Sequence, residues 1–302
     1  MCATCGCQDG ADAKIINIET GKTLSEPPAH HPHHHHHHDH AEPHLHSHGH
    51  EHGHHHHHDP GDVSSHRDQA QSGSTMRLEQ SILAKNDAIA ARNRAWFAGR
   101  EILALNLVSS PGAGKTAVLE RTLRGLQKTQ PCFVIEGDQA TSNDSERIKD
   151  AGAPAIQINT GSGCHLDASM VARALSALKP SFRSIVMIEN VGNLVCPALF
   201  DLGEHAKVLI LSVTEGEDKP VKYPHMFEAA RLLLINKIDL LPHLAFDLDR
   251  CMAYARQVNP GIEILALSAA TGEGFDAWHA WILNALSNMA DGPLQGHFGA
   301  AP

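Results

Sequence analysis

The sequence predicts an α/β fold with a mainly parallel sheet flanked by helices, preceded by a disordered, histidine-rich arm. From residue 102 onward, apolar runs of four to seven residues alternate with segments in which apolar residues recur at helical spacing. Such runs are typical of strands covered on both faces, and their alternation with helices favours parallel pairing through right-handed crossovers. Upstream, 19 of the 26 histidines lie between His30 and His58, where there is a single Leu and no Ile, Val or Phe. This window has too few large apolar side chains to form a hydrophobic core, so we expect it to be disordered.

The elements of the folded part can be assigned in order along the chain. A first helix is expected from Met76 to near Arg100, because large apolar residues recur there at helical spacing through a polar segment. Seven strands are predicted, at residues 102–108, 132–135, 155–158, 185–188, 207–213, 231–235 and 263–267. The intervening helices are predicted at residues 115–128, 168–178, 247–258 and 274–287.

Charge and hydropathy exclude two classes of partner. The formal charge is −10, of which −7 belongs to residues 1–75, and no basic patch of the kind that binds nucleic acid is present. No run of 18 apolar residues exists, so no membrane-spanning helix is expected. The N-terminus lacks the features of a secretory signal, which favours a cytoplasmic location. Thiols stay reduced there, so the seven cysteines are interpreted as metal ligands or core residues.

A phosphate-binding loop follows the first predicted strand. The segment SSPGAGKT, residues 109–116, lies between a strand and a helix, where backbone N–H groups and the helix N-terminus can surround phosphates. The lysine would reach the outer phosphates and the threonine hydroxyl would bind Mg²⁺. Ser109 stands where the usual pattern has its first glycine. The residues assigned to phosphate and Mg²⁺ are Gly112, Ala113, Gly114, Lys115 and Thr116.

The segment NKID, residues 236–239, predicts a preference for guanine. It follows an apolar run and so lies at the carboxyl end of a strand, where α/β sheets bind ligands. The Asp239 carboxylate can accept from both N1–H and the exocyclic amine of guanine, an arrangement that adenine does not offer. Ala270 stands where a lysine is often found in the loop behind the base, so backbone contacts must suffice there. The residues assigned to the base are Asn236, Lys237, Asp239, Ser268 and Ala269.

Two acidic residues are assigned to the metal that accompanies the phosphates. Asp138 closes the second predicted strand, and Glu189 begins a Glu-x-x-Gly element after the fourth, in which Gly192 would sense the γ-phosphate. Alternatively, Asp138 caps a helix or pairs with a lysine. No glutamine follows Gly192 at once, which predicts slow intrinsic hydrolysis. The residues expected to carry the GTPase reaction are Lys115, Thr116, Asp138, Glu189 and Gly192.

Cysteines at the start of the chain predict a transition-metal site. Cys2, Cys5 and Cys7 offer three thiolates within six residues, close to a free α-amine. Three sulfur donors and one nitrogen in a plane suit Ni(II), whereas Zn(II) prefers a tetrahedron. Zinc and copper are not excluded by this pattern, and an exposed trio without a ligand role is the alternative.

A second set of soft ligands lies inside the folded part. Cys164 and His165 follow the third predicted strand, and Cys196 lies four residues after Gly192. We expect these ligands at the ends of neighbouring strands, where they would converge on one ion and leave a position open. The alternative is a core cysteine and an isolated histidine, as we interpret Cys132 and Cys251. Because Cys196 follows the γ-phosphate sensor, nucleotide state is expected to alter metal affinity.

The histidine tract is interpreted as a metal buffer. At a pKa of about 6.5, roughly three quarters of exposed imidazoles are neutral at pH 7 and able to bind metal. A run of six histidines at residues 33–38 could be an expression tag. A tag normally lies at a terminus, whereas this tract is internal and interrupted by Asp, Glu, Gly and Pro.

These motifs occur together in an order that resembles one known family. The chain is similar to the HypB family, the nickel-incorporation GTPases of nickel-iron hydrogenase maturation. The resemblance covers the GTP-binding domain at residues 76–290 and the metal-binding motif and arm at residues 1–75, with residues 291–302 as a C-terminal tail. The motifs that carry the resemblance are Cys2–Cys7, the arm, residues 109–116, residues 136–138, Cys164 and His165, residues 189–192, Cys196 and residues 236–239.

The resemblance implies a P-loop NTPase fold and a GTP-dependent homodimer. It further implies that GTP binding and hydrolysis gate nickel delivery, with a nickel-accessory protein, to the hydrogenase large-subunit precursor. Under this reading, Cys2, Cys5 and Cys7 form the tight nickel site. A weaker nickel or zinc site near the dimer interface would consist of Cys164, His165 and Cys196.

Three other functions remain open at this point. A urease nickel-insertion GTPase shares the GTP-binding domain and sometimes a histidine-rich start, but we would not expect the cysteine trio there. In a nickel store, the arm would be the function and nucleotide hydrolysis incidental. A generic regulatory GTPase does not explain why so many soft ligands accompany the phosphate loop.

Overall fold

A computed structural model of the chain describes residues 13–24, 64–138, 147–148, 150–161 and 163–290. Contacts divide the chain into one unit of Met1–Leu24 with Leu78–Pro302 and another of Ser25–Arg77. The sheet and its core belong to the first unit, and the described part of the second is helical. The cysteines at positions 2, 5 and 7, the tract His30–His58 and residues 291–302 lie outside the described residues. Among the described helices, none combines the length and the apolarity that a membrane crossing requires.

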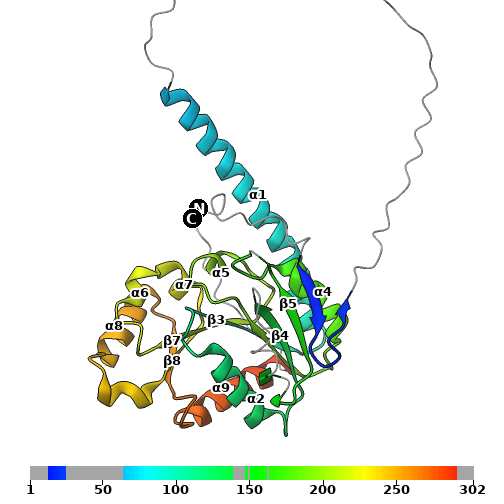
Figure 1. The fold of residues 1–302 in the computed structure, drawn as a ribbon, viewed down its shortest axis with the longest axis vertical. Helices are drawn as coiled ribbons and strands as arrows, with labels where there is room; N and C mark the ends of the chain where they lie inside the picture. The colour runs from blue at the N-terminus through cyan, green and yellow to red at the C-terminus, as the bar shows by residue number, and fades with distance from the viewer. Residues whose placement is uncertain (1–12, 25–63, 139–146, 149, 162, 291–302) are drawn as a thin grey trace, which may run out of the picture. The chain divides into compact units, whose positions relative to one another are not determined.

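The first unit is built on a nine-stranded sheet in the order β2-β1-β5-β4-β6-β3-β7-β8-β9 (Figure 1). The seven strands from β3 onward pair in parallel, as the sequence predicts, whereas β1 is antiparallel to both β2 and β5. The strands are β1 (Lys14–Asn17), β2 (Thr23–Leu24), β3 (Leu103–Ser109), β4 (Cys132–Asp138), β5 (Ala155–Asn159), β6 (Ile185–Glu189), β7 (Ala206–Ser212), β8 (Leu232–Asn236) and β9 (Glu263–Ala266).

Helices cover both faces of the sheet (Figure 1), because most residues of each central strand are apolar and buried, so both faces of the strand are apolar. Leu103, Leu105 and Leu107 of β3 pack in the core under α2 and α9, while Ala104 packs with α1 and α4 on the other face. The helices are α1 (Ser64–Ala98), α2 (Lys115–Leu126), α4 (Ala168–Leu178), α5 (Cys196–Leu199), α6 (Lys219–Lys222), α7 (Pro224–Ala229), the 3₁₀ helix η3 (Ile238–His243), α8 (Leu248–Val258) and α9 (Phe275–Ala290).

Two features near the N-terminus differ from the sequence-based expectation. The edge strand β1 lies within the range expected to be an arm, and it pairs with β5 through residues such as Ile15 opposite Ile158. Only Ile15 of its four residues is buried, so the segment carries no strong strand pattern. Helix α1 begins at Ser64 rather than Met76. Residues 64–75, which we expected to belong to the arm, contain no proline that would stop the helix from beginning earlier.

Candidate nucleotide and metal sites

A cleft of about 420 Å³ lies at the carboxyl ends of the central strands. The phosphate loop after β3 forms one wall, and the ends of β4 and β6 form the other. These three strands are neighbours in the sheet, in the order β4-β6-β3, so motifs far apart in the sequence meet here. The lining includes Lys115, Thr116, Glu136, Asp138, Glu189 and Gly192.

One acidic residue of the cleft, Glu189, contacts the side chains of both Lys115 and Thr116 in the phosphate loop. Lys115 Nζ and Thr116 Oγ1 donate to Glu189 Oε1, at 2.8 and 2.6 Å. The other oxygen, Glu189 Oε2, is buried and has no hydrogen-bonding partner among the described residues. A buried carboxylate oxygen without a donor is costly unless it binds a cation. Its place beside a lysine and a threonine hydroxyl fits a Mg²⁺ ion bound with the phosphates.

The predicted base loops are held against the phosphate loop by two side chains, those of Asn236 and Lys237. Asn236 Nδ2 donates to Ala113 O at 2.9 Å, and Asn236 Oδ1 accepts from Ala269 N at 3.1 Å. Lys237 Nζ donates to Gly112 O at 2.8 Å. The structure therefore brings together the segments at residues 109–116 and 236–239 and the loop of Ser268 and Ala269.

The carboxylate assigned to the base is held by the loop behind it. Ser268 Oγ donates to Asp239 Oδ1, and the same hydroxyl oxygen accepts from Thr271 N at 3.1 Å. Arg121 of α2 donates to three carbonyls of this loop, those of Ala269, Ala270 and Thr271. Sequence reasoning missed Arg121, because it lies almost 150 residues from the loop that it holds.

The three internal soft ligands come together at one end of the sheet. Cys164 Sγ lies 3.2 Å from Cys196 Sγ and 3.6 Å from His165 Nδ1. All three ligand atoms lie within 4.8 Å of one another. Ligands about 2.0–2.3 Å from one tetrahedral ion are about 3.5 Å apart, so this spacing fits a single bound metal. Cys196 and His165 are buried and Cys164 is half-buried, which leaves one side open to an entering ion.

The strands that carry these ligands are not neighbours, contrary to the sequence-based expectation. The Cys164–His165 loop follows β5 and Cys196 follows β6, and β4 lies between them. The loops nevertheless meet, because β4 carries Gly137 near its end. A Cβ atom at this position would lie 2.7 Å from the Leu166 side chain, so only glycine lets the loop cross β4.

The environment of His165 favours a neutral imidazole. Burial lowers the pKa of His165, and the nearby Asp167 carboxylate opposes this only in part. Its ring packs on Phe200, with centroids 3.9 Å apart. A neutral histidine can bind a metal ion, whereas a protonated one cannot.

Asn190 connects the nucleotide cleft with the metal ligands. It directly follows Glu189, and its Oδ1 accepts from the backbone N–H of Leu166 at 3.1 Å. Leu166 is the residue after His165. The backbone next to the candidate ligand His165 is therefore hydrogen-bonded to the side chain of Asn190, which follows Glu189 of the cleft. Sequence reasoning included Asn190 in a motif but gave it no role.

The two cysteines interpreted as core residues are buried. Cys132 lies in β4 and Cys251 in α8, on different faces of the sheet. Burial raises the pKa of Cys132 to about 11 and that of Cys251 to about 12. Thiols with such pKa values are poor metal ligands at neutral pH.

Comparison with known proteins places the chain in a family. A family model described as CobW/HypB/UreG, nucleotide-binding domain, matches residues 103–266. The chain is 57% identical over 222 residues to the hydrogenase maturation factor HypB of Escherichia coli (strain K12), covering 74% of this chain and 77% of that protein. The chain belongs to the HypB family.

A more distant HypB relative carries a broader description. The hydrogenase/urease maturation factor HypB of Helicobacter pylori (strain J99) is 35% identical over 216 residues, which covers 70% of this chain and 88% of that protein. Sequence identity over 216 residues supports the resemblance to the HypB family that the motifs indicate.

Solved structures of HypB proteins share this fold. HypB from Archaeoglobus fulgidus is 36% identical, with a TM-score of 0.64, over 67% of this chain and 99% of that one. HypB from Helicobacter pylori, in complex with nickel, is 34% identical, with a TM-score of 0.65, over 71% of this chain and 100% of that one. The fold is that of a P-loop NTPase, as the sequence predicts.

Proposed function

We propose that this HypB protein is a GTPase that couples GTP hydrolysis to nickel delivery during hydrogenase maturation. The observation that carries the proposal is the joining of two sites by Glu189 and Asn190. Glu189 contacts Lys115 and Thr116 of the phosphate loop, and Asn190 holds the loop that bears His165. The hydrogenase maturation factors among its relatives, and a relative solved with nickel, support this function.

The nucleotide is GTP with Mg²⁺. Asp239 is positioned by Ser268 beside the loop of Ala269, where a carboxylate selects guanine by two hydrogen bonds. When Mg²⁺ is bound, it neutralises charge on the phosphates. Thr116, Asp138 and Glu189 would hold it, and Gly192 lies in the same cleft beside the expected γ-phosphate.

Calorimetry with GTP and ATP tests the nucleotide assignment. We expect heat from GTP with Mg²⁺ and at least a hundredfold preference over ATP. The Asp239→Asn variant should lose most of its preference for GTP over ATP. It should bind xanthosine triphosphate more tightly than the wild type does, because xanthine offers an acceptor to the new amide. An unchanged preference in Asp239→Asn would contradict the assignment.

We assign two further metal sites to nickel. Cys164, His165 and Cys196 form an internal nickel or zinc site, whose three donors leave a coordination position for water or a second subunit. Val195 precedes Cys196 and Leu199 follows it, and both apolar side chains are nearly half exposed. This exposure supports a GTP-dependent homodimer through this region. The cysteines at positions 2, 5 and 7 are the tight nickel site, and the tract His30–His58 is the nickel store.

Titration of Ni(II) separates these sites. We expect a tight site that is lost in a Cys2/Cys5/Cys7→Ala variant and a weaker one that survives there but is lost in Cys164→Ser. Retention of the tight site in the triple variant would displace the assignment. Removing residues 30–58 should leave hydrogenase maturation intact in ample nickel, whereas a storage protein would lose its function.

The protein partners that we propose are those that take part in nickel delivery. A nickel-accessory protein would assist transfer to the hydrogenase large-subunit precursor, in the cytoplasm. Urease is a second candidate target, because the Helicobacter pylori relative is described as a hydrogenase/urease maturation factor. Gene deletion with separate hydrogenase and urease assays decides between them, since loss of urease with normal hydrogenase would refute the first choice.

A further inference from the structure

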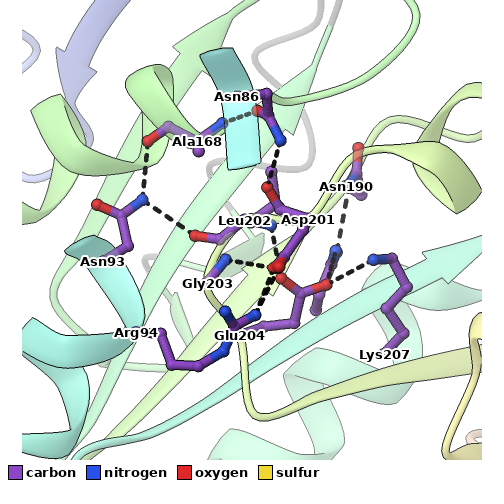
Figure 2. Close-up of polar contacts among 11 residues, drawn as sticks. Asn86, Asn93, Arg94, Ala168, Asn190, Asp201, Leu202, Gly203, Glu204 and Lys207 are labelled. Carbon is purple, nitrogen blue, oxygen red and sulfur yellow. Dashed lines mark hydrogen bonds and ion pairs between the residues drawn. The ribbon is translucent and has the colours of Figure 1, made fainter. Parts of the chain in front are cut away.

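Two buried asparagines of α1 lie between the two segments that continue from the internal metal ligands. Asn86 and Asn93 lie about two helical turns apart, on the side of α1 that faces the sheet, and are 6% and 5% exposed. Burying an amide is costly unless its donors and acceptors are satisfied. Each of these amides forms two long-range hydrogen bonds (Figure 2).

Asn86 connects the start of α4 to the loop before β7. Its Oδ1 accepts from Ala168 N at 2.9 Å, and its Nδ2 donates to Asp201 O at 2.8 Å (Figure 2). Ala168 lies three residues after His165, and Asp201 lies five residues after Cys196. One side chain of α1 therefore connects the two segments that follow the metal ligands.

Asn93 makes a second connection between the same two segments. Its Nδ2 donates to Ala168 O at 2.8 Å and to Leu202 O at 3.0 Å. Both backbone groups of Ala168 are thus bonded to α1, one by each asparagine (Figure 2). The two halves of the site are separate in sequence, and in this region both are fixed to one rigid helix.

The loop before β7 is shaped to receive α1. Arg94 donates to both oxygens of Asp201, at 2.8 and 2.6 Å, and Asp201 Oδ1 also accepts from Gly203 N. Gly203 has a φ of +88°, and a Cβ atom there would lie 2.5 Å from Ala90 O of α1. Only glycine permits this approach of loop and helix.

A buried polar network continues from this loop to the end of β6. Glu204 accepts from Leu202 N and from Asn106 Nδ2, and Asn106 Oδ1 accepts from Asn190 Nδ2 at 3.2 Å. Lys207 pairs with the Glu204 carboxylate at 2.9 Å. Asn190 in turn holds Leu166, so the network returns to the ligand loop.

We propose that Asn86 and Asn93 are positioning residues that set the separation between Cys164–His165 and Cys196. This inference rests on the proposed function, in which those three residues bind a metal ion. Neither asparagine supplies a ligand. By fixing both downstream segments to α1, they keep three donors within reach of one ion in advance of binding, which lowers the ordering cost of metal binding.

The test uses Co(II) as a probe of the full-length chain in the Cys2/Cys5/Cys7→Ala background. Co(II) bound by Cys164 and Cys196 gives a thiolate charge-transfer band and d–d bands that report geometry. We expect Asn86→Ala and Asn93→Ala each to weaken Co(II) binding at least fivefold and to change the d–d bands. The affinity for GTP should stay within twofold, because neither residue contacts the nucleotide cleft.

Controls separate positioning from general loosening. Gln80→Ala removes an exposed amide from the same helix and should leave the Co(II) spectrum unchanged. If Asn93→Ala does not fold, Asn86→Ser, which keeps a short acceptor for Ala168 N, should still shift the spectrum.

Two outcomes overturn the inference. One is wild-type Co(II) affinity and spectrum in the folded variants, and the other is a parallel loss of GTP and Co(II) affinity. A failure of the proposed metal site itself is distinct, since the parent with intact Asn86 and Asn93 would then give no thiolate band.

Discussion

Asn236 shows how one side chain can hold a nucleotide site together. Its amide spans a carbonyl of the phosphate loop and a backbone N–H of the loop behind the base. Its side chain is therefore committed to positioning, while Asp239 remains available to contact the base. Sequence reasoning placed Asn236 at the site from the NKID motif and its position after a strand. The two partners, Ala113 and Ala269, lie in motifs that the sequence assigns to the site, but they contribute only backbone atoms, so their contacts with Asn236 could not be predicted.

The first prediction concerns Asn236→Ala. Removing the amide leaves the buried carbonyl of Ala113 and the half-buried N–H of Ala269 without this partner, at up to about 1–3 kcal/mol each. We expect GTP affinity, measured by calorimetry, to fall at least tenfold.

Asn259→Ala is the matched control for this change. Asn259 also bridges backbone carbonyls, those of Phe227 and Ala230, but away from the cleft. It should reduce thermal stability without changing GTP affinity. Equal GTP affinities in Asn236→Ala and the wild type would contradict the positioning role.

At the scale of elements, the buried strands and the motifs at their ends could be predicted because both are local in sequence. Residues such as Glu136 and Glu189 directly follow apolar runs, so their place at one edge of the sheet follows from parallel pairing. Strand order is not local, and the expected adjacency of β5 and β6 was therefore wrong. The contacts of Asn86 with Ala168 and Asp201 join residues 82 and 115 positions apart, beyond what periodicity can indicate.

The second prediction concerns helix α2 and the loop behind the base. Arg121 donates to the carbonyls of residues 269–271 and so fixes a loop that lacks the lysine often found there. We expect Arg121→Ala to weaken GTP binding about fivefold and to reduce the preference for GTP over ATP, because the loop must then be ordered on binding. Arg121→Lys should restore little, since an ammonium lacks the planar fork of donors.

Arg124→Ala is the matched control on the same helix. Arg124 is largely exposed and pairs with Glu120 one turn away, so its loss should leave nucleotide binding unchanged. The role of Arg121 is refuted if both variants bind GTP like the wild type.

At the scale of the whole molecule, stability should decrease in mild acid. His205 Nδ1 accepts from Ala104 N at 3.1 Å, which requires an unprotonated nitrogen. Burial, and then the Arg94 guanidinium, lower the pKa of His205 to about 4. The unfolded chain has a pKa of about 6.5 there, so it binds protons more readily between these values. The stabilisation is therefore complete above pH 6.5 and is lost as the pH falls toward 4.

The third prediction is the resulting change in urea denaturation. Between pH 7.5 and 5.0, we expect the free energy of unfolding to fall by on the order of 1–2 kcal/mol through His205. His205→Gln should be less stable at pH 7.5 and show a shallower decrease. Burial also lowers the pKa of His165 and His279, so some decrease will remain. If the free energy of unfolding instead falls between pH 7.5 and 5.0 by the same amount in His205→Gln, in the exposed control His243→Gln and in wild type, this role of His205 is excluded.

The coupling that we propose between the two sites involves the whole molecule. The nucleotide cleft and the soft ligands share the end of β6, through Glu189, Asn190 and Cys196. In the function that we propose, a change in the contacts of Glu189 with the phosphate loop would be passed through Asn190 to the loop that bears His165.

The most direct test measures Ni(II) affinity at the internal site in a Cys2/Cys5/Cys7→Ala variant that also lacks residues 30–58, with either GDP or a non-hydrolysable GTP analogue and Mg²⁺. The account predicts dissociation constants that differ by at least fivefold between the two nucleotide states, and no difference in an added Asn190→Ala variant. Dissociation constants that agree within error in the two states would contradict it.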